Sequence, residues 1–292
     1  MKADDLLERI LRAPVYDVAV ESPLDPATRL SERLDNRVLL KREDLQPIFS
    51  FKLRGAYNRI RRLDAQARAA GVVAASAGNH AQGVALAATR LGIDARIVMP
   101  RTTPAIKVDA VRRLGAEALL EGDGYDEAAT VARRIEQEEG RVFVHPYDDP
   151  DVIAGQGTIA LELLRQHSGA LDAIFVPVGG GGLIAGVAAY VKRISPETRV
   201  IGVEPHDAAC LAAALEAGEP VDIGPVGLFA DGVAVRRVGD HPFSVAREAV
   251  DEVVTVGIDE ICAAIRDVFD DTRSIAEPAG ALAVAGLKRW VE

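Results

Sequence analysis

The stretch IFVPVGGGGLIAGVAAYV, residues 174–191, places four glycines between two apolar runs. This pattern predicts a strand over 173–178 and a helix over 183–194, joined by the glycines. Glycines at such a junction let the backbone approach an anion closely, and the start of a helix offers N–H groups without helical partners. We therefore expect residues 179–182 to bind a phosphate group, and a turn without a ligand is the alternative. No lysine follows the glycines, so the stretch does not match a nucleotide P-loop.

The same order of strand, turn and helix recurs along the chain. The predicted strands are continuous apolar runs without alternation, which is typical of parallel strands buried on both faces. Strands that alternate with helices predict an α/β fold of parallel-rich twisted sheets flanked by helices. The predicted strands span 72–75, 95–99, 118–120, 141–145, 173–178, 200–203 and 253–256, and the predicted helices span 80–91, 105–114, 125–139, 153–167, 183–194, 207–217, 259–269 and 278–291.

Two prolines, Pro146 and Pro150, interrupt this pattern near the middle of the chain. Proline ends helices and central strands, so a boundary between lobes is expected there. We expect residues 69–147 to form a smaller lobe. Residues 1–68 and 148–292 are expected to form a larger, discontinuous lobe.

Composition narrows the class of protein. Of the 292 residues, 49% are hydrophobic, and 44 acids against 34 bases give a net charge of −10. A net negative charge argues against nucleic acid or an anionic membrane as the main partner. No apolar run reaches the roughly 20 residues of a membrane span, and the acidic start of the chain lacks the apolar core of a signal peptide. We expect a cytoplasmic protein.

Cys210 and Cys262 each stand alone in an apolar helical pattern. We interpret both as small buried hydrophobic residues. Neither has a second ligand at metal-site spacing, so no metal site is predicted. The sequence shows no evident disulfide framework, which fits a reducing compartment.

Two polar segments complement the glycine turn. Lys52 lies in SFKLRGA, residues 50–56, between an aromatic residue and the start of a helix, and SAGNH, residues 76–80, lies between a predicted strand and a predicted helix. An amine, a polar clamp and an anion-binding turn are the parts that bind a phosphorylated aldehyde through a Schiff base. The alternatives are a solvated lysine at Lys52 and a simple helix cap at Asn79. The sequence has no G-x-S-x-G motif, so a serine hydrolase is not predicted.

Together, in this order and at these separations, the three segments resemble the fold-type II pyridoxal-phosphate enzymes. Within that family the chain is most similar to the biosynthetic threonine dehydratases (threonine deaminases). The resemblance covers nearly the whole chain, and the combination of motifs is specific although each one alone is not. Further matching segments are KREDLQP at 41–47, VIAGQGT at 152–158, GLFADGVAV at 227–235 and AEPAGA at 276–281.

The resemblance implies a two-lobed fold like that of the tryptophan synthase β chain, with pyridoxal 5'-phosphate as cofactor. Lys52 would hold the cofactor and remove the α-proton of L-threonine, the β-hydroxyl would leave, and 2-oxobutanoate and ammonia would form as the first step towards isoleucine. L-serine would be a slower substrate, and the protein would be a homo-oligomer, a dimer or a tetramer. The resemblance implies that Phe51 packs on the cofactor ring, that Gly232 lies beside the ring, and that Asn79 bonds the ring 3-oxygen. It implies that the cofactor phosphate is bound by Gly179, Gly180, Gly181, Gly182 and Leu183. It also implies that the substrate carboxylate is held by Ser76, Ala77, Gly78, Asn79 and His80.

Three departures from relatives refine this expectation. Similar serine racemases have a serine at the position of Ala77, where it acts as a second base, so elimination is favoured here over racemisation. Those racemases also bind a divalent metal, with acids at the positions of Glu204 and Cys210. Glu204 is present in this chain, but Cys210 replaces the second acid, so that metal site is not expected. The sequence stops at Glu292, before the strand that carries the ring-nitrogen serine in the family and without a regulatory domain. The alternatives are therefore a serine dehydratase or racemase, or a non-catalytic truncated fragment that binds the cofactor.

Overall fold

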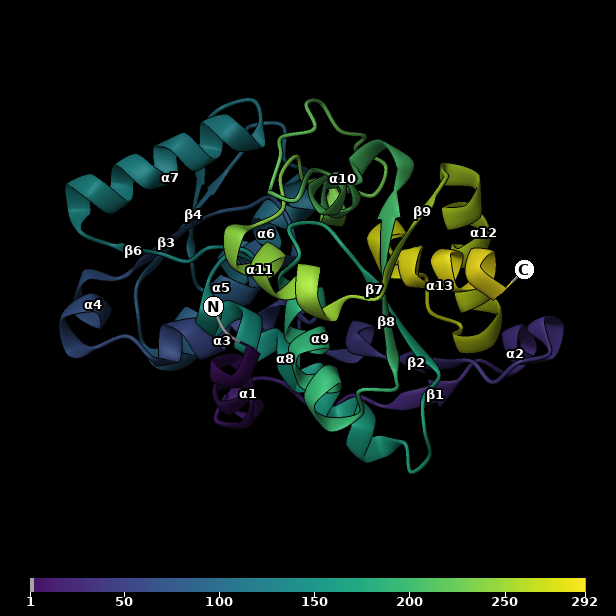
Figure 1. Ribbon diagram of the computed structural model, residues 1–292. Coiled ribbons are helices and arrows are strands. Elements are labelled where there is room, and N and C mark those ends of the chain that lie inside the picture. Colours follow the sequence, from purple (N-terminus) through teal and green to yellow (C-terminus); the bar gives the residue numbers. More distant parts are fainter. Residues whose placement is uncertain (1–2, 292) are drawn as a thin grey trace. The chain divides into compact units, whose positions relative to one another are not determined.

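The computed structural model describes residues 3–291, which form two compact units (Figure 1). Unit 1 comprises Met1–Arg12, Ser22–Arg42 and Gly157–Glu292. Unit 2 comprises Ala13–Glu21 and Glu43–Gln156. Unit 2 thus contains the predicted smaller lobe together with flanking segments. These segments join it because the helix that begins at Lys52 packs closely against the helix that begins at Asn79.

Unit 2 is built on a parallel sheet of four strands in the order β5-β4-β3-β6. Its strands are β3 (Val72–Ala75), β4 (Ala95–Met99), β5 (Glu117–Leu120) and β6 (Val142–Phe143). Every side chain of β3 is buried, as the continuous apolar run predicts for a central parallel strand. The predicted bounds of β3 and β4 agree with the structure, whereas β6 is shorter than the predicted strand over 141–145.

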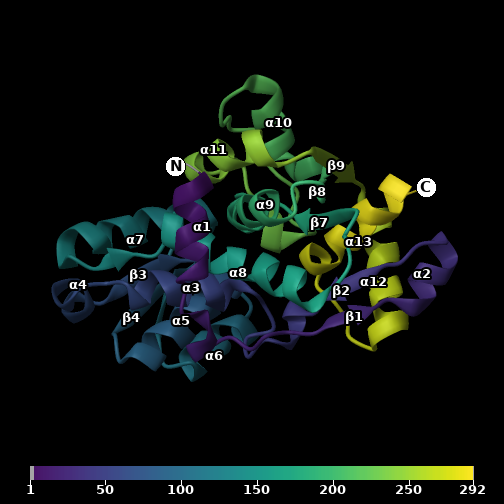
Figure 2. The same cartoon turned by 60° about the horizontal axis from the view of Figure 1, so that its bottom comes forward.

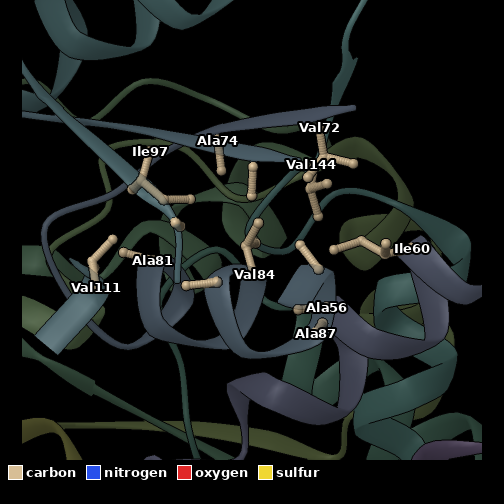
Figure 3. Packing of buried hydrophobic residues seen from close by; sticks show 14 of the residues in the cluster. Ala56, Ile60, Val72, Ala74, Ala81, Val84, Ala87, Ile97, Val111 and Val144 are labelled. Carbon is tan, nitrogen blue, oxygen red and sulfur yellow. The ribbon is translucent and has the colours of Figure 1, made fainter. Parts of the chain in front are cut away.

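Helices cover both faces of this sheet. Successive side chains of β3 point to opposite faces, and each of these apolar side chains is buried against a helix. Val72 and Ala74 pack with α3 (Lys52–Arg61), α5 (Asn79–Leu91) and α6 (Ala105–Arg113), as Figure 3 shows. The next side chains of the strand, Val73 and Ala75, pack against Ala128 and Ala132 of α7. A further helix of unit 2, α4 (Ala65–Ala70), is capped by Asp64, and α7 spans Tyr125–Glu139.

Unit 1 contains a parallel sheet of three strands in the order β7-β8-β9. Adjacent residues of β8 show which helix covers each face: Gly202 faces Ile184 of α9, and Val203 lies against Gly286 of α13. Figures 1 and 2 show α9 and α13 on opposite sides of these strands, with α12 beside α13. The bounds are β7 (Ala173–Pro177), β8 (Arg199–Pro205), β9 (Glu252–Val256), α9 (Gly182–Ile194), α12 (Ile258–Thr272) and α13 (Pro278–Val291).

The remaining elements are mostly ones that the sequence did not predict. A two-stranded antiparallel ribbon in unit 1 pairs β1 (Leu24–Pro26) with β2 (Leu39–Lys41). The predicted helix over 207–217 is divided into a 3-10 turn, His206–Ala208, and α10 (Cys210–Ala217). The other helices are α1 (Ala3–Leu11), α2 (Thr28–Leu34), α8 (Pro150–Gln166) and α11 (Asp240–Ala249), and the other 3-10 turns are η1 (Val15–Asp17), η2 (Glu43–Leu45) and η4 (Asp231–Val233).

The α/β class predicted from the sequence is confirmed, with parallel sheets and flanking helices in both units. Cys210 is buried as predicted, but the prediction for Cys262 is wrong, because its side chain is exposed. The buried side of α12 carries Ile261 and Ala264, and Cys262 points away from it. Within residues 3–291, every helix is too short or too polar to cross a membrane.

Gly55 gives a direct test of the packing in unit 2. A methyl group at this helical position would lie 2.4 Å from the Gln156 amide nitrogen and 2.7 Å from the Val152 carbonyl oxygen. We expect Gly55→Ala to lower the free energy of unfolding by about 1–3 kcal/mol, because overpacking forces the backbone apart. Urea-induced unfolding measures this change.

Gly280, also helical, is the matched control for Gly55. A methyl group there would have its nearest neighbours at 3.7 Å, which is an ordinary contact. Gly280→Ala should therefore leave stability unchanged or raise it by up to about 1 kcal/mol through helix propensity. Equal effects of the two substitutions would contradict the packing described for α3.

Candidate active site

Lys52 is the first residue of α3, and Phe51 occupies the N-cap position. The Lys52 backbone N–H lies 3.4 Å from Ser50 Oγ, and its Nζ donates to the Pro146 carbonyl oxygen at 3.1 Å. The same Nζ lies 5.5 Å from the centre of the Phe51 ring. Lys52 is only half-exposed. It is therefore a positioned amine, and the alternative of a freely solvated lysine does not hold.

A buried ion pair fixes the first turn of α3. Arg54 is fully buried, and its Nε and Nη2 donate to the two carboxylate oxygens of Glu43, both at 2.8 Å. Gln46, also buried, donates to the Val20 carbonyl oxygen at 2.7 Å and accepts from the Val20 N–H at 2.9 Å. Bidentate contacts of this kind fix geometry as well as charge. The position of Lys52, two residues before Arg54, is therefore set by a polar network.

The SAGNH segment connects β3 to α5. The N-cap of α5 is Gly78 and Asn79 is its first residue, so the interpretation of Asn79 as a helix cap is wrong. Ser76 Oγ accepts a hydrogen bond from Gly78 N–H at 3.2 Å, which closes the turn. The first N–H groups of a helix have no helical partners and carry its positive dipole. Residues 76–80 therefore present a helix start that suits a carboxylate.

The His80 side chain is turned into the protein. It is 4% exposed, and its Nε2 lies 2.9 Å from the Val144 carbonyl oxygen. Burial, followed by the nearby charge of Lys52, lowers the pKa of His80 to about 3. The ring is therefore neutral at pH 7, and the carbonyl contact requires the proton on Nε2. At the start of α5, His80 can therefore contact a ligand only through its backbone.

The glycine turn between β7 and α9 has its carbonyl groups tied back into unit 1. The Gly179 oxygen lies 3.3 Å from the Cys210 thiol, the Gly180 oxygen accepts from Gly239 N–H at 3.1 Å, and the Gly181 oxygen accepts from Ala185 N–H at 3.0 Å. With these carbonyls engaged, the amides at the start of α9 are the groups that can meet an anion. Gly182 and Leu183 are the first two residues of that helix.

Gly181 requires glycine for conformational reasons. Its φ is +88°, and a methyl group there would lie 2.8 Å from Pro242 Cβ. Gly232 lies in η4, where a methyl group would lie 2.9 Å from the Ala279 side chain. Both glycines therefore permit close packing around the turn in unit 1.

Several residues that support these groups were not predicted from the sequence. Pro146 and Cys210 act through a backbone carbonyl and a weak thiol donor, which no motif reveals. Glu204 is fully buried and accepts the N–H groups of Leu211 and Ala212 at 2.8 and 2.9 Å, so it caps α10. Burial raises the pKa of Glu204 to about 7, although both hydrogen bonds oppose the shift. Across residues 3–291, we find no cluster of three or more His, Cys, Asp or Glu side chains that could hold a metal ion.

Two groups suit the cofactor predicted from the sequence: Lys52 with Phe51, and the glycine turn of residues 179–182. A positioned primary amine, Lys52, matches an aldehyde, and a ring of Phe51 beside it matches an aromatic face. A glycine turn at the start of a helix matches a phosphate. The first group belongs to unit 2 and the second to unit 1.

The neutral His80 predicts a specific dependence of stability on pH. Its pKa is lower in the folded protein than the usual 6.5, so its contribution to stability is complete above pH 6.5 and is lost as the pH falls towards 3. We expect a loss of up to about 1.4 kcal/mol of unfolding free energy per pH unit in this window. Urea unfolding at pH 7 and pH 5 should show this slope in the wild type and a shallower slope in His80→Gln. Identical slopes in both proteins would show that His80 titrates normally.

Comparisons with known proteins agree with these features. The family model for pyridoxal-phosphate dependent enzymes matches residues 16–292. The chain is 58% identical over 295 residues to the biosynthetic L-threonine dehydratase of Burkholderia multivorans, an alignment that covers 100% of this chain and 58% of that relative. The chain thus spans little more than half the length of this curated relative.

Two solved structures are similar over almost the whole chain. The processed form of threonine deaminase isoform 2 from Solanum lycopersicum has a TM-score of 0.97 and 51% identity, and the match covers 99% of this chain and 84% of that one. Maize serine racemase has a TM-score of 0.93 and 34% identity, with 98% and 88% coverage. The match of the family model, the similarity to these enzymes and the positioned Lys52 agree, and the chain belongs to the family of pyridoxal-phosphate dependent enzymes.

Proposed function

We propose that this chain deaminates L-threonine to 2-oxobutanoate and ammonia, with pyridoxal phosphate bound through Lys52 and with L-serine as a slower substrate. The observation that carries the proposal is the Lys52 amine, which opens a helix, is half-buried and is held 3.1 Å from a backbone carbonyl oxygen. Similarity to threonine dehydratase and threonine deaminase over at least 99% of the chain supports this choice of substrate. The Burkholderia multivorans relative is named a biosynthetic enzyme, so we place the reaction on the route to isoleucine.

In this proposal the predicted residues bind and orient the ligands. The amides at the start of α9, in residues 179–183, bind the phosphate of the cofactor, and Gly181 permits the turn they require. Phe51 packs on the cofactor ring, Gly232 lies beside the ring, and the Asn79 amide donates to its 3-oxygen. The residues that hold the substrate carboxylate are Ser76, Ala77, Gly78, Asn79 and His80, the last through its backbone.

The proposed chemistry of the chain centres on a single amine. Pyridoxal phosphate, when bound, supplies an electron sink for the carbon that carries the amino group. Lys52 removes the proton from that carbon, and the β-hydroxyl leaves with one proton as water. Addition of water to the resulting enamine then releases 2-oxobutanoate and ammonia. Ala77 carries no group that transfers a proton, so the chain offers no second base at that position. A single-base arrangement favours elimination over racemisation.

Substrate preference distinguishes the alternatives. Threonine and serine differ by one methyl group, which a pocket discriminates by about 1–3 kcal/mol. More pyruvate from L-serine than 2-oxobutanoate from L-threonine at equal concentration would indicate a serine dehydratase, and D-serine would indicate a racemase. Cofactor binding without any turnover would indicate a non-catalytic fragment.

We also propose a cytoplasmic, homo-oligomeric protein. An exposed free thiol at Cys262 supports a reducing compartment. Exposed apolar side chains on unit 1, including Leu228 at 75% and Ile275 at 80%, support association between copies. Light scattering of the purified chain gives the oligomeric state, and a monomer at micromolar concentration would contradict this part of the proposal.

Loss of the Lys52 amine should abolish the reaction. We expect Lys52→Ala to lower the rate of 2-oxobutanoate formation by at least about a hundredfold, because a positioned base contributes that much. The matched control is Lys107→Ala in α6 of the same unit, which should retain the wild-type rate. Wild-type protein that forms no 2-oxobutanoate with the cofactor present would refute the proposed activity.

Gly181 should be needed for cofactor affinity. Gly181→Ala forces a methyl group into a left-handed backbone conformation, at a cost of about 1–2 kcal/mol. We expect the dissociation constant for pyridoxal phosphate, measured by absorbance titration, to rise about tenfold. Gly218→Ala is the control: its φ is +77° and a methyl group there meets no atom within 4 Å, so it carries similar backbone strain outside the turn. Equal loss of affinity in both variants would contradict the proposed role of the turn in binding the phosphate of the cofactor.

A further inference from the structure

The loop that follows β6 binds both Lys52 and His80. Lys52 Nζ donates to the Pro146 carbonyl oxygen at 3.1 Å, and His80 Nε2 lies 2.9 Å from the Val144 carbonyl oxygen. The two carbonyls are two residues apart along one short segment. Lys52 and His80 come from different helices, α3 and α5, and all four residues belong to unit 2.

Contacts on both sides of Pro146 hold this loop in place. Val144 N–H donates to the Val73 carbonyl oxygen at 2.9 Å, which continues the sheet. His145 Nδ1 accepts the N–H groups of Tyr147 and Asp148 at 3.3 and 2.8 Å. The proline ring fixes φ at Pro146 itself. The direction of the Pro146 carbonyl therefore depends on a small number of identifiable hydrogen bonds.

His80 is the side chain that ties this loop to α5. Its ring is buried and neutral at pH 7, so it donates one hydrogen bond from Nε2 to the Val144 carbonyl oxygen. Without that donor, the buried carbonyl of Val144 would lose a partner, which a protein tolerates poorly. The loop would then shift towards other donors, and the Pro146 carbonyl would move with it.

We propose that His80 is a positioning residue for Lys52: by binding the Val144 carbonyl, it fixes the loop whose Pro146 carbonyl holds the Lys52 amine. The Pro146 carbonyl then accepts a hydrogen bond from the amine whenever Lys52 is not bonded to the cofactor. This inference rests on the proposed function, because it concerns the amine proposed to carry the cofactor. The competing interpretation is that His80 only fills space in the core.

Chemical labelling of Lys52 tests the proposal without an activity assay. The full chain, freed of cofactor with hydroxylamine, is treated with acetic anhydride, and mass spectrometry gives the labelling rate of each lysine. Lys192 is the internal reference, because its Nζ also donates to carbonyl oxygens, those of Pro196 and Thr198 at 3.3 and 2.9 Å. The quantity measured is the ratio of the Lys52 rate to the Lys192 rate.

Two substitutions separate positioning from packing. His80→Leu fills the space but has no donor, and we expect the ratio to rise about tenfold as the amine is released. His80→Gln keeps an N–H donor at the position of Nε2 and should restore the wild-type ratio. An unchanged ratio in His80→Leu, or an equal rise in both variants, would overturn the proposal. If His80→Leu does not fold, His80→Asn replaces it, since its shorter amide cannot reach Val144 and must raise the ratio.

The failure of this inference can be distinguished from failure of the proposed function. The absorbance of the wild-type chain with pyridoxal phosphate, compared with that of Lys52→Ala, reports the link to the cofactor. Lys52-dependent absorbance together with an unchanged labelling ratio in His80→Leu would overturn the positioning role alone. A labelling ratio that responds as expected, without Lys52-dependent absorbance, would overturn the proposed function alone.

Discussion

The buried ion pair between Arg54 and Glu43 is the interaction on which the position of Lys52 depends. Arg54 follows Lys52 by two residues in the first turn of α3, and its guanidinium has no exposed surface. Removing one partner of such a pair leaves an uncompensated buried charge, at a cost of about 3–5 kcal/mol. The pair therefore contributes little net stability but strongly disfavours other arrangements of the turn. The ion pair thereby fixes the position of Lys52, and the hydrogen bond to the Pro146 carbonyl orients its amine.

A second constraint governs the glycine turn of unit 1. Each carbonyl from Gly179 to Gly181 is engaged by a different donor, from α10, from the segment before α11 and from α9. In the proposed function, the amides of this turn are the groups that meet the phosphate. Glu204 belongs to the same arrangement, because it caps the helix that carries Cys210. In the proposed function, the affinity of the turn for a phosphate would depend on backbone orientation, and no cationic side chain would be required.

Much of the fold could be predicted because its signals are local. The strands β3 and β4 and the helices α7 and α13 have the predicted bounds, since continuous apolar runs and helical periodicity end at clear turn residues. The missed elements depend on distant contacts. The ribbon of β1 and β2 has three residues per strand and pairs segments separated by a helix, and the division of the predicted helix over 207–217 follows from capping by Glu204. In the site, Lys52 and the glycines were recognisable as residue types. The Pro146 carbonyl was not, because every residue has a carbonyl group.

The most direct test of the account is to locate the cofactor on the chain. Borohydride reduction of the protein with bound pyridoxal phosphate makes the carbon–nitrogen link permanent, and mass spectrometry of the digested chain then identifies the modified lysine. The account predicts that the modification lies on the peptide containing Lys52, and that inorganic phosphate at high concentration reduces its yield by competing for the glycine turn. Modification of a different lysine, or a yield that phosphate does not affect, would contradict the roles assigned to Lys52 and to the turn.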